Sequence, residues 1–514
     1  TVDPATTVSL TRLDRAPGGA VADAVDWRVS STDAALEVQA LNLGSSLRIA
    51  LPADLLTAED WGLRLEFRLT EAPHDRVLLA ANGFTLGFTD KTLLYLRNDR
   101  GDSDTAPLPI PACRWLGLAL CCRDGRCIVS VEGHSDAIVL ARLGVDLPAS
   151  APHEIAIGAS PIEALRTLNA AIGRIVLTRG APVVASFRIP ATGRPSRINA
   201  AAGGGAVLHV ENAPTFAMRS ARWDGSAHDP RQAPDHYDAV MLHDDDVGDA
   251  AWPVTHRIAV PADAESGVYG LTVQAAGHST TWPFFVTPRR RRADLVFLTP
   301  SFTYLAYADE RLPEDLFPWR CDDAGHRFAR ANGLTSLYDV HNDGTGVSLA
   351  GFHRPLATIR DDYLYPLCGA PHLLPVDLHL LRFLAAQGIG VDLITDAELH
   401  RDGIAALAGY RGLVTGSHPE YWTAAMLDAV ESFQAGGGHL AYLGGNGSYW
   451  VTATDGDTIE VRRGTRGIRT WSSESGEAHL AMTGEPGGLW RHAGRPEHRL
   501  LGVPQLVNPV LDHH

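Results

Sequence analysis

GLVTGSHPEYW (residues 412–422) and GGGHLAYLGGNGSYW (436–450) open and close the stretch that decides the fold of the C-terminal half. Each part carries a short apolar run that ends in glycine and polar residues, and an amphipathic segment joins them. This order predicts a strand, a loop, a helix, a second strand and a second loop. Both loops then follow the carboxyl ends of parallel strands, the edge where open α/β sheets bind their ligands. We therefore expect the functional site at that edge.

The same alternation of strands and helices extends upstream. The run ADLVFLTPS (293–301) is continuously apolar, which is typical of a strand buried on both faces. The segment 377–388 predicts a helix with Asp377 as its N-cap, and Thr423 predicts the N-cap of another helix. Alternating strands and helices predict a doubly wound, glutamine-amidotransferase-like α/β domain over residues 291–514, which is the expected catalytic domain.

The N-terminal half has the pattern of a β-sandwich. Short runs such as LRLEFRL (63–69) and CIVSVEG (127–133) alternate apolar and polar residues, and polar turns separate them. Many short strands of this kind predict a lectin-like jelly roll, of laminin-G or concanavalin type, over residues 31–195. We expect residues 1–30 to form an N-terminal arm. Sugar binding would follow from such a fold only by analogy.

Residues 196–290 are β-rich again and predict an immunoglobulin-like β-sandwich. The stretch SGVYGLTVQAAGHSTTWPFFV (266–286) predicts two strands around a turn. Upstream lies a polar cluster in which His243 precedes three aspartates, 244–246. Histidine and aspartate at this density could ligate a metal, but their spacing matches no ligand pattern. A loop tied by Asx turns and docked against the next domain is the favoured interpretation.

Composition limits the classes of partner. The net charge of −16 argues against nucleic acid and against an anionic membrane surface. No apolar stretch approaches the ~20 residues of a membrane helix. The six cysteines show no CxxC spacing, which favours reduced thiols in a cytoplasmic protein.

Two common kinds of site are excluded by their motifs. The loop Gly-Ser-His-Pro-Glu (416–420) is not the G-x-S-x-G of a nucleophile elbow, and GGNGSYW (444–450) does not follow the order of a dinucleotide site. A cluster of polar groups without an evident nucleophile remains. Two further loops supply Tyr304, Tyr307 and Tyr338 to it.

Several motifs occur together in a specific order. They are TYLAYA (303–308), SLYDVHNDGTGV (336–347), DLIT (392–395), TGSHPEYW (415–422), LGGNGSYW (443–450) and GGLWRHAGRP (487–496). Through them the chain resembles the large (beta) subunit of N,N-dimethylformamidase and its relatives. The resemblance covers most of the chain, although the jelly roll fits only in its position.

The resemblance implies an iron-dependent amidohydrolase. Such an enzyme cleaves the C–N bond of small N-substituted formamides to formate and an amine. The family holds one iron ion, here expected as Fe³⁺, through two tyrosines and a glutamate, which map to Tyr307, Tyr338 and Glu420, with Tyr304 as the alternative first ligand. A small accessory subunit and a hetero-oligomer are also implied. Phenolate and carboxylate are hard oxygen ligands that suit such an ion.

Two residues of the matching segments are candidates for catalysis. His418 would move a proton from water to the departing amine, and Asn446 would hold the amide or the developing oxyanion. The alternative for His418 is a structural hydrogen bond in a tight loop. The alternative for Asn446 is a turn residue in a left-handed conformation between glycines.

Two other functions remain open at this point. One is a non-catalytic carbohydrate-binding or scaffold protein, and the other is a metal-dependent hydrolase of another amide. In the family the chain continues beyond the GGLWR segment and supplies a further acidic residue. Glu474 and Glu477 are the candidates to replace it here.

Overall fold

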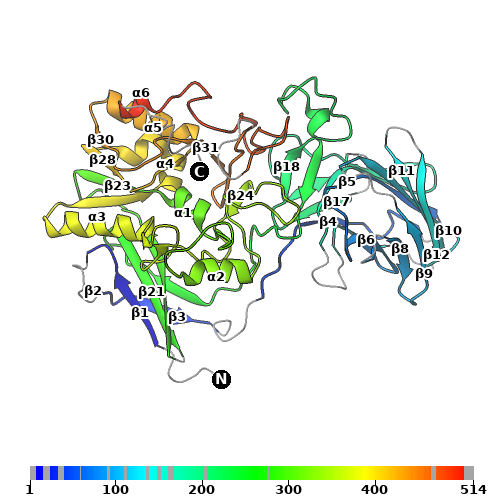
Figure 1. Ribbon diagram of the computed structural model, residues 1–514, viewed down its shortest axis with the longest axis horizontal. Helices are drawn as coiled ribbons and strands as arrows, with labels where there is room; N and C mark the ends of the chain where they lie inside the picture. Colours follow the sequence, from blue (N-terminus) through cyan, green and yellow to red (C-terminus); the bar gives the residue numbers. More distant parts are fainter. Residues whose placement is uncertain are drawn as a thin grey trace.

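The computed structural model describes twelve segments, and every statement below concerns only those residues: 7–15, 23–32, 40–57, 60–89, 93–108, 113–134, 138–147, 152–159, 167–201, 205–275, 277–464 and 471–502. Figure 1 shows two lobes. One is a large antiparallel sandwich, and the other joins a parallel sheet to a smaller β unit. The prediction of a multidomain, β-rich protein is confirmed.

The sandwich lobe consists of two eight-stranded antiparallel sheets. The first sheet contains β5 (Asp60–Leu69), β10 (Leu116–Arg123), β11 (Arg126–Gly133), β12 (Val139–Asp146), β14 (Ala170–Thr178), β15 (Val183–Phe187), β18 (Thr215–Met218) and β19 (Ala239–Leu242). The second contains β4 (Ser46–Ala50), β6 (Val77–Ala81), β7 (Phe84–Phe88), β8 (Leu93–Asn98), β9 (Ser103–Pro107), β13 (Glu154–Ile157), β16 (Arg197–Asn199) and β17 (Val207–Glu211). Alternation builds the core, since Leu63, Leu65 and Phe67 are buried while Arg64 between them is exposed.

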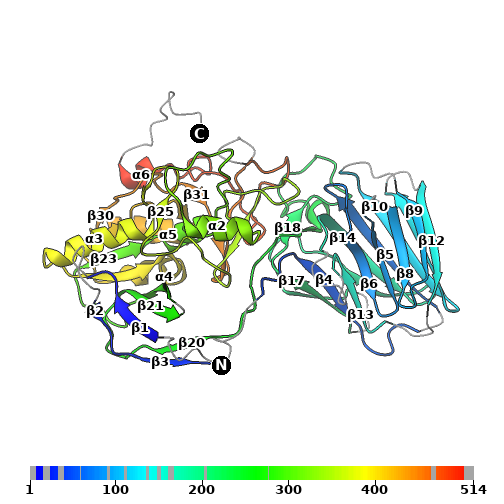
Figure 2. The same ribbon diagram turned by 60° about the horizontal axis from the view of Figure 1, so that its bottom comes forward.

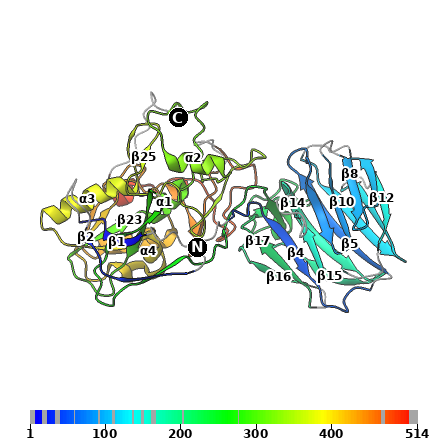
Figure 3. The ribbon, with the colours of Figure 1, turned by 90° about the horizontal axis from the view of Figure 1, so that it is seen from below.

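The strand pairings extend the sandwich beyond residue 195, the predicted limit between the jelly roll and the next domain. β17 pairs with β4, and β19 pairs with β14, so residues 197–242 belong to the sandwich sheets. The physical reason is burial, because all four residues of β19 are buried and complete the sandwich core. β16 and β17 lie on the side of the sandwich that faces the other lobe (Figure 3).

The N-terminal segment forms strands rather than an isolated arm. The small β unit contains β1 (Thr7–Arg12), β2 (Asp23–Ala24), β3 (Arg28–Ser31), β20 (His256–Ala259), β21 (Gly267–Ala275) and β22 (His278–Val286). β1 pairs with β21 along its whole length, and the two lie side by side in Figure 2. The predicted pair of strands over 266–286 is confirmed, since β21 and β22 form an antiparallel hairpin.

The C-terminal part is centred on a four-stranded parallel sheet with the order β27-β23-β28-β30. Its strands are β23 (Leu295–Thr299), β27 (Val391–Thr395), β28 (Gly412–Thr415) and β30 (His439–Ala441). The helices are α1 (Ser301–Tyr307), α2 (Ala324–Ala331), α3 (Leu374–Ala386), α4 (Asp396–Asp402), α5 (Ala424–Ala435) and α6 (His498–Leu501), with 3₁₀ turns η2 (Pro234–Tyr237) and η3 (Gly403–Leu407). Short strands complete it: β24 (Leu349–Gly351), β25 (Leu364–Tyr365), β26 (Ala370–Pro371), β29 (Tyr421–Trp422), β31 (Trp450–Val451), β32 (Ala453–Thr454) and β33 (Thr458–Glu460).

One predicted helix cap is confirmed and another is wrong. The Thr423 side chain accepts a hydrogen bond from the backbone N–H of Met426 and caps α5. Asp377 was expected to cap its helix, but α3 begins earlier, at Leu374, with a proline in its first turn. Proline favours the first turn because it needs no donor there, so Asp377 lies inside the helix and is buried.

The sheet brings together the segments that carry the candidate residues. β23 and β28 are adjacent and parallel, with Leu298 opposite Thr415 at their carboxyl ends. Helix α1 therefore starts beside the loop that carries His418 and Glu420. Within the described segments, no helix is long and apolar enough to cross a membrane. All six cysteines are free thiols.

Candidate metal and catalytic site

The side chains of the three predicted metal ligands meet at one carboxylate oxygen, Oε2 of Glu420. The hydroxyl of Tyr338 donates a hydrogen bond to Oε2 of Glu420 at 2.9 Å, and the hydroxyl of Tyr307 donates to the same oxygen at 3.1 Å. The two phenol rings pack with centroids 4.2 Å apart. Glu420 is fully buried. We call these three residues the tyrosine–glutamate cluster.

The two predicted catalytic residues lie against the same carboxylate. Nε2 of His418 is 3.1 Å from Oε2 of Glu420 and 3.5 Å from the Tyr307 hydroxyl. Asn446 donates its side-chain N–H to the other oxygen, Oε1, at 2.9 Å, and the indole N–H of Trp450 donates there at 3.0 Å. All five side chains that the motifs indicate are therefore in one place.

Tyr304, the alternative ligand, lies elsewhere. Its hydroxyl donates to Oδ2 of Asp377, and its side chain is buried between α1 and α3. Tyr304 and Tyr307 are three residues apart on α1, and each donates its hydroxyl hydrogen to a different carboxylate. The structure thus brings Tyr307, and not Tyr304, against Glu420.

Local backbone geometry fixes the position of Glu420. Its N–H donates to Oγ1 of Thr303 in α1, and its carbonyl accepts the N–H of Trp450. The next residue begins β29, which pairs in parallel with β31. Gly444 is required because a Cβ atom there would lie 2.3 Å from Cδ of Pro419. The loop therefore holds the carboxylate through contacts on both sides.

Asn446 has the left-handed conformation predicted for a turn residue between glycines, and its side chain contacts Glu420. Its φ of 48° lies in the left-handed region, which asparagine tolerates better than most residues. Ser448, two residues later, also has a positive φ of 43°. Strained backbone that still holds a side chain on a buried carboxylate is characteristic of functional sites.

The electrostatics of the cluster depend on its burial. Desolvation first, and then the nearby Glu420 carboxylate, raise the pKa of Tyr307 and of Tyr338 well above the ordinary value for tyrosine. Two neutral phenols that donate to one carboxylate are the expected state without a cation. A bound cation would reverse this balance, because it stabilises the phenolates.

Sequence reasoning missed two neighbours of Tyr338. The hydroxyl of Tyr421 donates to the Tyr338 hydroxyl at 2.9 Å. The buried guanidinium of Arg463 lies 4.6 Å from the centre of the Tyr338 ring and 4.5 Å from that of Trp450. Tyr421 could have been found, because it directly follows Glu420 in the matching motif. Arg463 stands in no motif that predicts a role.

His372 was also missed. Its ring meets Tyr307 edge to face, with centroids 5.6 Å apart, and lies 5.8 Å from the ring of His418. Desolvation first, and then His418, lower the pKa of His372 to about 4. No sequence pattern around Pro371 and His372 indicates this position.

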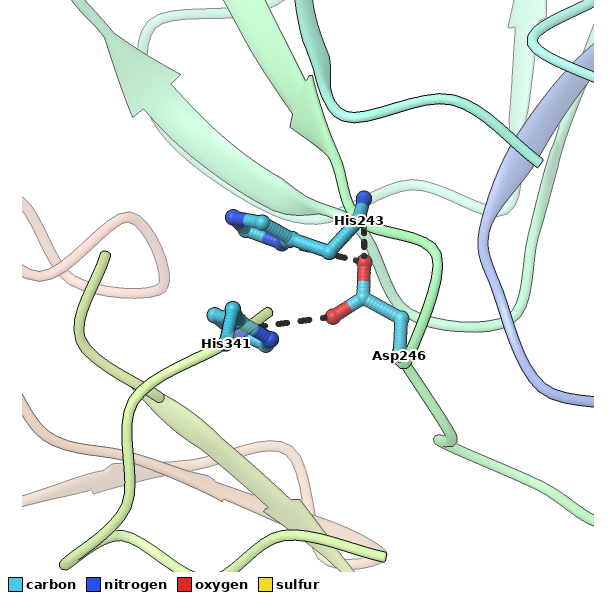
Figure 4. A group of neighbouring side chains, drawn as sticks. All are labelled: His243, Asp246 and His341. Carbon is cyan, nitrogen blue, oxygen red and sulfur yellow. Dashed lines mark hydrogen bonds and ion pairs between the residues drawn. The ribbon is translucent and has the colours of Figure 1, made fainter. Parts of the chain in front are cut away.

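A second polar cluster lies between the two lobes (Figure 4). His243, Asp246 and His341 are buried, and their possible ligand atoms lie within 4.8 Å of one another, a grouping that could hold a metal ion. The two imidazole rings are stacked, 3.6 Å apart and within 5° of parallel. We call these three residues the histidine cluster.

The stacking argues against a shared ion in the observed arrangement. A metal bound by imidazole lies near the ring plane, and two parallel planes 3.6 Å apart do not meet. Nε2 of His243 lies 3.0 Å from Oγ1 of Thr345, and Nδ1 of His341 lies 2.6 Å from Asp245. The other two ring nitrogens, Nδ1 of His243 and Nε2 of His341, face different oxygens of Asp246 at 3.3 and 3.9 Å (Figure 4).

The loop beside the histidine cluster ties the sandwich to the loop that carries Tyr338. Oδ2 of Asp245 accepts the N–H of Asn342 at 3.1 Å and a guanidinium N–H of Arg311 at 3.1 Å. The Thr70 hydroxyl of the sandwich donates to Oδ2 of Asp343 at 2.7 Å. The expected docking of the 243–246 loop against the next domain is thereby confirmed.

Glu474 and Glu477 are not part of the tyrosine–glutamate cluster. Nε of Arg219 donates to Oε1 of Glu477 at 3.0 Å, and Glu474 is largely exposed beside the same arginine. Both line a cavity of about 550 Å³ at the junction of the lobes, together with Trp471.

Fold and site together define a class: a β-rich, multidomain protein with a buried tyrosine–carboxylate cluster at the edge of a parallel sheet. Residues 215–511 match the family model described as N,N-dimethylformamidase beta subunit-like, C-terminal. The chain belongs to this family, as the sequence motifs predicted.

Two curated relatives match a similar length of this chain. The N,N-dimethylformamidase beta subunit of Paracoccus aminophilus is 32% identical over 308 residues, which are 57% of this chain and 40% of the relative. The protein of the same name from an Alcaligenes species is 30% identical over 319 residues, which are 59% of this chain and 42% of the relative. The matches thus span about two fifths of the length of these relatives.

Solved structures resemble this chain only remotely. A heptameric SAP-like pentraxin from Limulus polyphemus is 8% identical, with a TM-score of 0.21, over 40% of this chain and 94% of that one. Domain 4 of an extracellular arabinanase from Geobacillus stearothermophilus, in complex with arabinotriose, is 12% identical, with a TM-score of 0.20, over 34% of this chain and 82% of that one.

Proposed function

We propose that this chain is the catalytic part of an amidohydrolase that cleaves small N-substituted formamides, such as N,N-dimethylformamide, to formate and an amine. One observation carries the proposal: two phenol oxygens, one from helix α1 and one from a loop, converge on a single oxygen of a fully buried glutamate. Family membership and the names of the relatives support it. Burying a carboxylate is costly unless hydrogen bonds compensate, and a site that gathers several donors around one buried charge is a candidate functional site.

The donor set fits one ferric ion held by Tyr307, Tyr338 and Glu420. All three donors are hard, anionic oxygens when deprotonated, the kind that ions of this class prefer. Each phenol oxygen lies 2.9–3.1 Å from the carboxylate oxygen. The three oxygens are thus gathered at one place, where these side chains would hold the ion. When bound, the ion supplies Lewis acidity for the substrate carbonyl and for water.

The neighbouring side chains would divide the remaining work. Asn446 and Trp450 hold Oε1 of Glu420 and so orient Oε2 toward the phenols. Nε2 of His418 faces the same oxygens and would carry a proton from water to the departing amine nitrogen. The second N–H of Asn446 would hold the developing oxyanion. Water adds to the formyl carbon, the C–N bond breaks, and the amine leaves with the transferred proton.

The family relationship supports further proposals. The relatives are named beta subunits, so we propose a small accessory subunit and a hetero-oligomer. The parallel sheet order β27-β23-β28-β30 supports a doubly wound, glutamine-amidotransferase-like domain. Free thiols support a cytoplasmic location. A metal-dependent hydrolase of another amide is the second candidate, because the same cluster would serve a larger acyl group.

A substrate panel separates these functions. The chain is loaded with iron and offered N,N-dimethylformamide, N-methylformamide, N,N-dimethylacetamide and a larger anilide, with released amine as the readout. Turnover of formamides above the other amides supports the proposal. Turnover of only the larger amides supports the second candidate. Binding to a glycan array with no amine release from any compound would overturn both.

A further inference from the structure

His372 lies beside Tyr307 of the tyrosine–glutamate cluster, at the end of a short hairpin. Strands β25 and β26 pair through Leu364 with Pro371 and Tyr365 with Ala370, and His372 follows at once. The Tyr365 ring stacks on the imidazole with centroids 4.9 Å apart. On its other sides the imidazole meets the rings of Tyr307 and His418. The hairpin therefore places a second imidazole, in addition to that of His418, beside Tyr307.

The Nδ1 atom of His372 is buried and has no hydrogen-bond partner among the described residues. A buried polar atom without a partner costs about 1–3 kcal/mol, and each such atom in a native structure needs an explanation. His418, in contrast, already lies within hydrogen-bond distance of Glu420 and Tyr307. Of the two imidazoles beside Tyr307, His372 is therefore the one with a buried nitrogen that has no partner among the described residues.

The backbone next to His372 is strained. Leu373 has a φ of 58° and a ψ of −123°, a region that side chains other than glycine rarely adopt. The Leu373 side chain itself is buried. Relaxing this strain would turn the preceding residue away from the cluster. Strain of this kind persists only where the surrounding structure enforces it.

We propose that His372 is a further substrate-binding residue, whose Nδ1–H donates a hydrogen bond to the formyl oxygen of the bound amide. This inference rests on the proposed function. A formamide oxygen has two lone pairs, so one remains for a hydrogen-bond donor when the other faces the cluster. An N,N-disubstituted formamide has no N–H, so this oxygen is the only polar atom by which such a substrate is oriented.

Three substitutions distinguish the contribution of the Nδ1 atom from that of the rest of the ring. His372→Asn places an amide N–H near the position of Nδ1, and His372→Gln places one nearer the position of Nε2. His372→Phe keeps the stacking on Tyr365 and removes both nitrogens. A matched control is His479→Phe, because Nδ1 of His479 is also buried and without a partner but lies beside Asp229 and Arg231.

The experiment measures KM and kcat for N,N-dimethylformamide, and the Kd of sodium formate by calorimetry, in the full iron-loaded chain. We expect His372→Phe and His372→Gln to raise KM and Kd by about 3- to 10-fold, the loss of one hydrogen bond. We expect His372→Asn to restore both within about 2-fold. Iron content and the tyrosinate absorption of all variants should equal those of the wild type, and His479→Phe should change neither constant.

Two results would overturn the inference alone. One is a His372→Phe variant with wild-type KM and formate Kd, and the other is an equal loss in the Asn, Gln and Phe variants. In either case an active, iron-loaded wild type would leave the proposed function standing. A wild type that holds no iron and releases no amine would overturn the proposed function and the inference together.

Discussion

The molecule contains two buried polar clusters that differ in the geometry of their polar atoms. In the tyrosine–glutamate cluster, two hydroxyls approach one carboxylate oxygen at 2.9 and 3.1 Å. In the histidine cluster, the rings are stacked in parallel, and the two nitrogens that face Asp246 approach different carboxylate oxygens, at 3.3 and 3.9 Å. The histidine cluster is compact, but its polar atoms do not approach a single oxygen as the two hydroxyls do. Convergence on one point, rather than proximity, is what a metal ion requires.

The two clusters are nevertheless connected. The loop that carries Tyr338 also carries His341, three residues further on. Asp245 holds this loop to the sandwich lobe through His341, Asn342 and Arg311. On the proposed function, the tyrosine–glutamate cluster would perform the chemistry, and the histidine cluster would hold the loop of Tyr338 in position.

The largest effect is expected at Glu420. Glu420→Gln keeps the shape of the side chain but removes the charge that would hold the cation and the acceptor capacity shared by both phenols. We expect iron content to fall below a tenth of the wild-type value and kcat/KM to fall by about 100-fold or more. Metal analysis and amine release measure the two. Full iron occupancy in this variant would contradict the account.

The next effect is expected at Asp245, which is buried and pairs with Arg311 and His341. Asp245→Ala leaves both partners without their carboxylate, which costs about 3 kcal/mol of unfolding free energy. Denaturant titration measures this loss. Asp146→Ala is the matched control, because its ion pair with Arg126 is exposed and contributes about 0–1 kcal/mol. If both substitutions lowered the unfolding free energy equally, the contacts of Asp245 between the lobes would stabilise the protein no more than an exposed ion pair does.

A smaller effect is expected at His341. His341→Asn keeps a polar atom near Asp245 and removes the stacking on His243, which contributes about 1 kcal/mol. We expect a slight loss of thermal stability and unchanged iron content, measured by calorimetry and metal analysis. Loss of the iron in this variant would place the ion in the histidine cluster instead.

The smallest effect is a pH dependence at Asp396. Burial raises the pKa of this carboxyl well above its ordinary value of 3.8. The unfolded chain therefore releases the proton first, and stability falls as pH rises above about 4, until the folded state also ionises. Asp396→Asn removes the titration, so its melting temperature should fall less than that of the wild type between pH 4 and pH 7. Parallel melting curves for the two proteins would contradict this.

The members of the tyrosine–glutamate cluster were predicted through the family resemblance that the short motifs carry, and not from residue chemistry alone. Each member lies in a short segment with a recognisable order, and parallel strands bring such segments to one edge. The choice between Tyr304 and Tyr307 could not be made, because it depends on which carboxylate each helix face meets. Asp377 shows the same limit, since a residue that matches a cap motif is instead the buried partner of Tyr304.

Contacts between distant segments were beyond the sequence patterns. β1 pairs with β21, and β17 pairs with β4, across long stretches of chain. Apolar alternation predicts that each strand exists but does not identify its neighbour. His341 and His372 were missed as contact residues for the same reason, because only the assembled lobes bring them to His243 and to Tyr307.

The central claim is that Tyr338 and Tyr307 bind one ferric ion with Glu420. The most direct measurement is metal analysis of the purified chain together with its visible absorption spectrum, for the wild type and for Tyr338→Phe. The account predicts about one iron per chain and a tyrosinate-to-iron charge-transfer band in the wild type, with the band weakened and the iron largely lost in the variant. A wild type without iron, or a Tyr338→Phe variant that keeps both its iron and its activity, would contradict it.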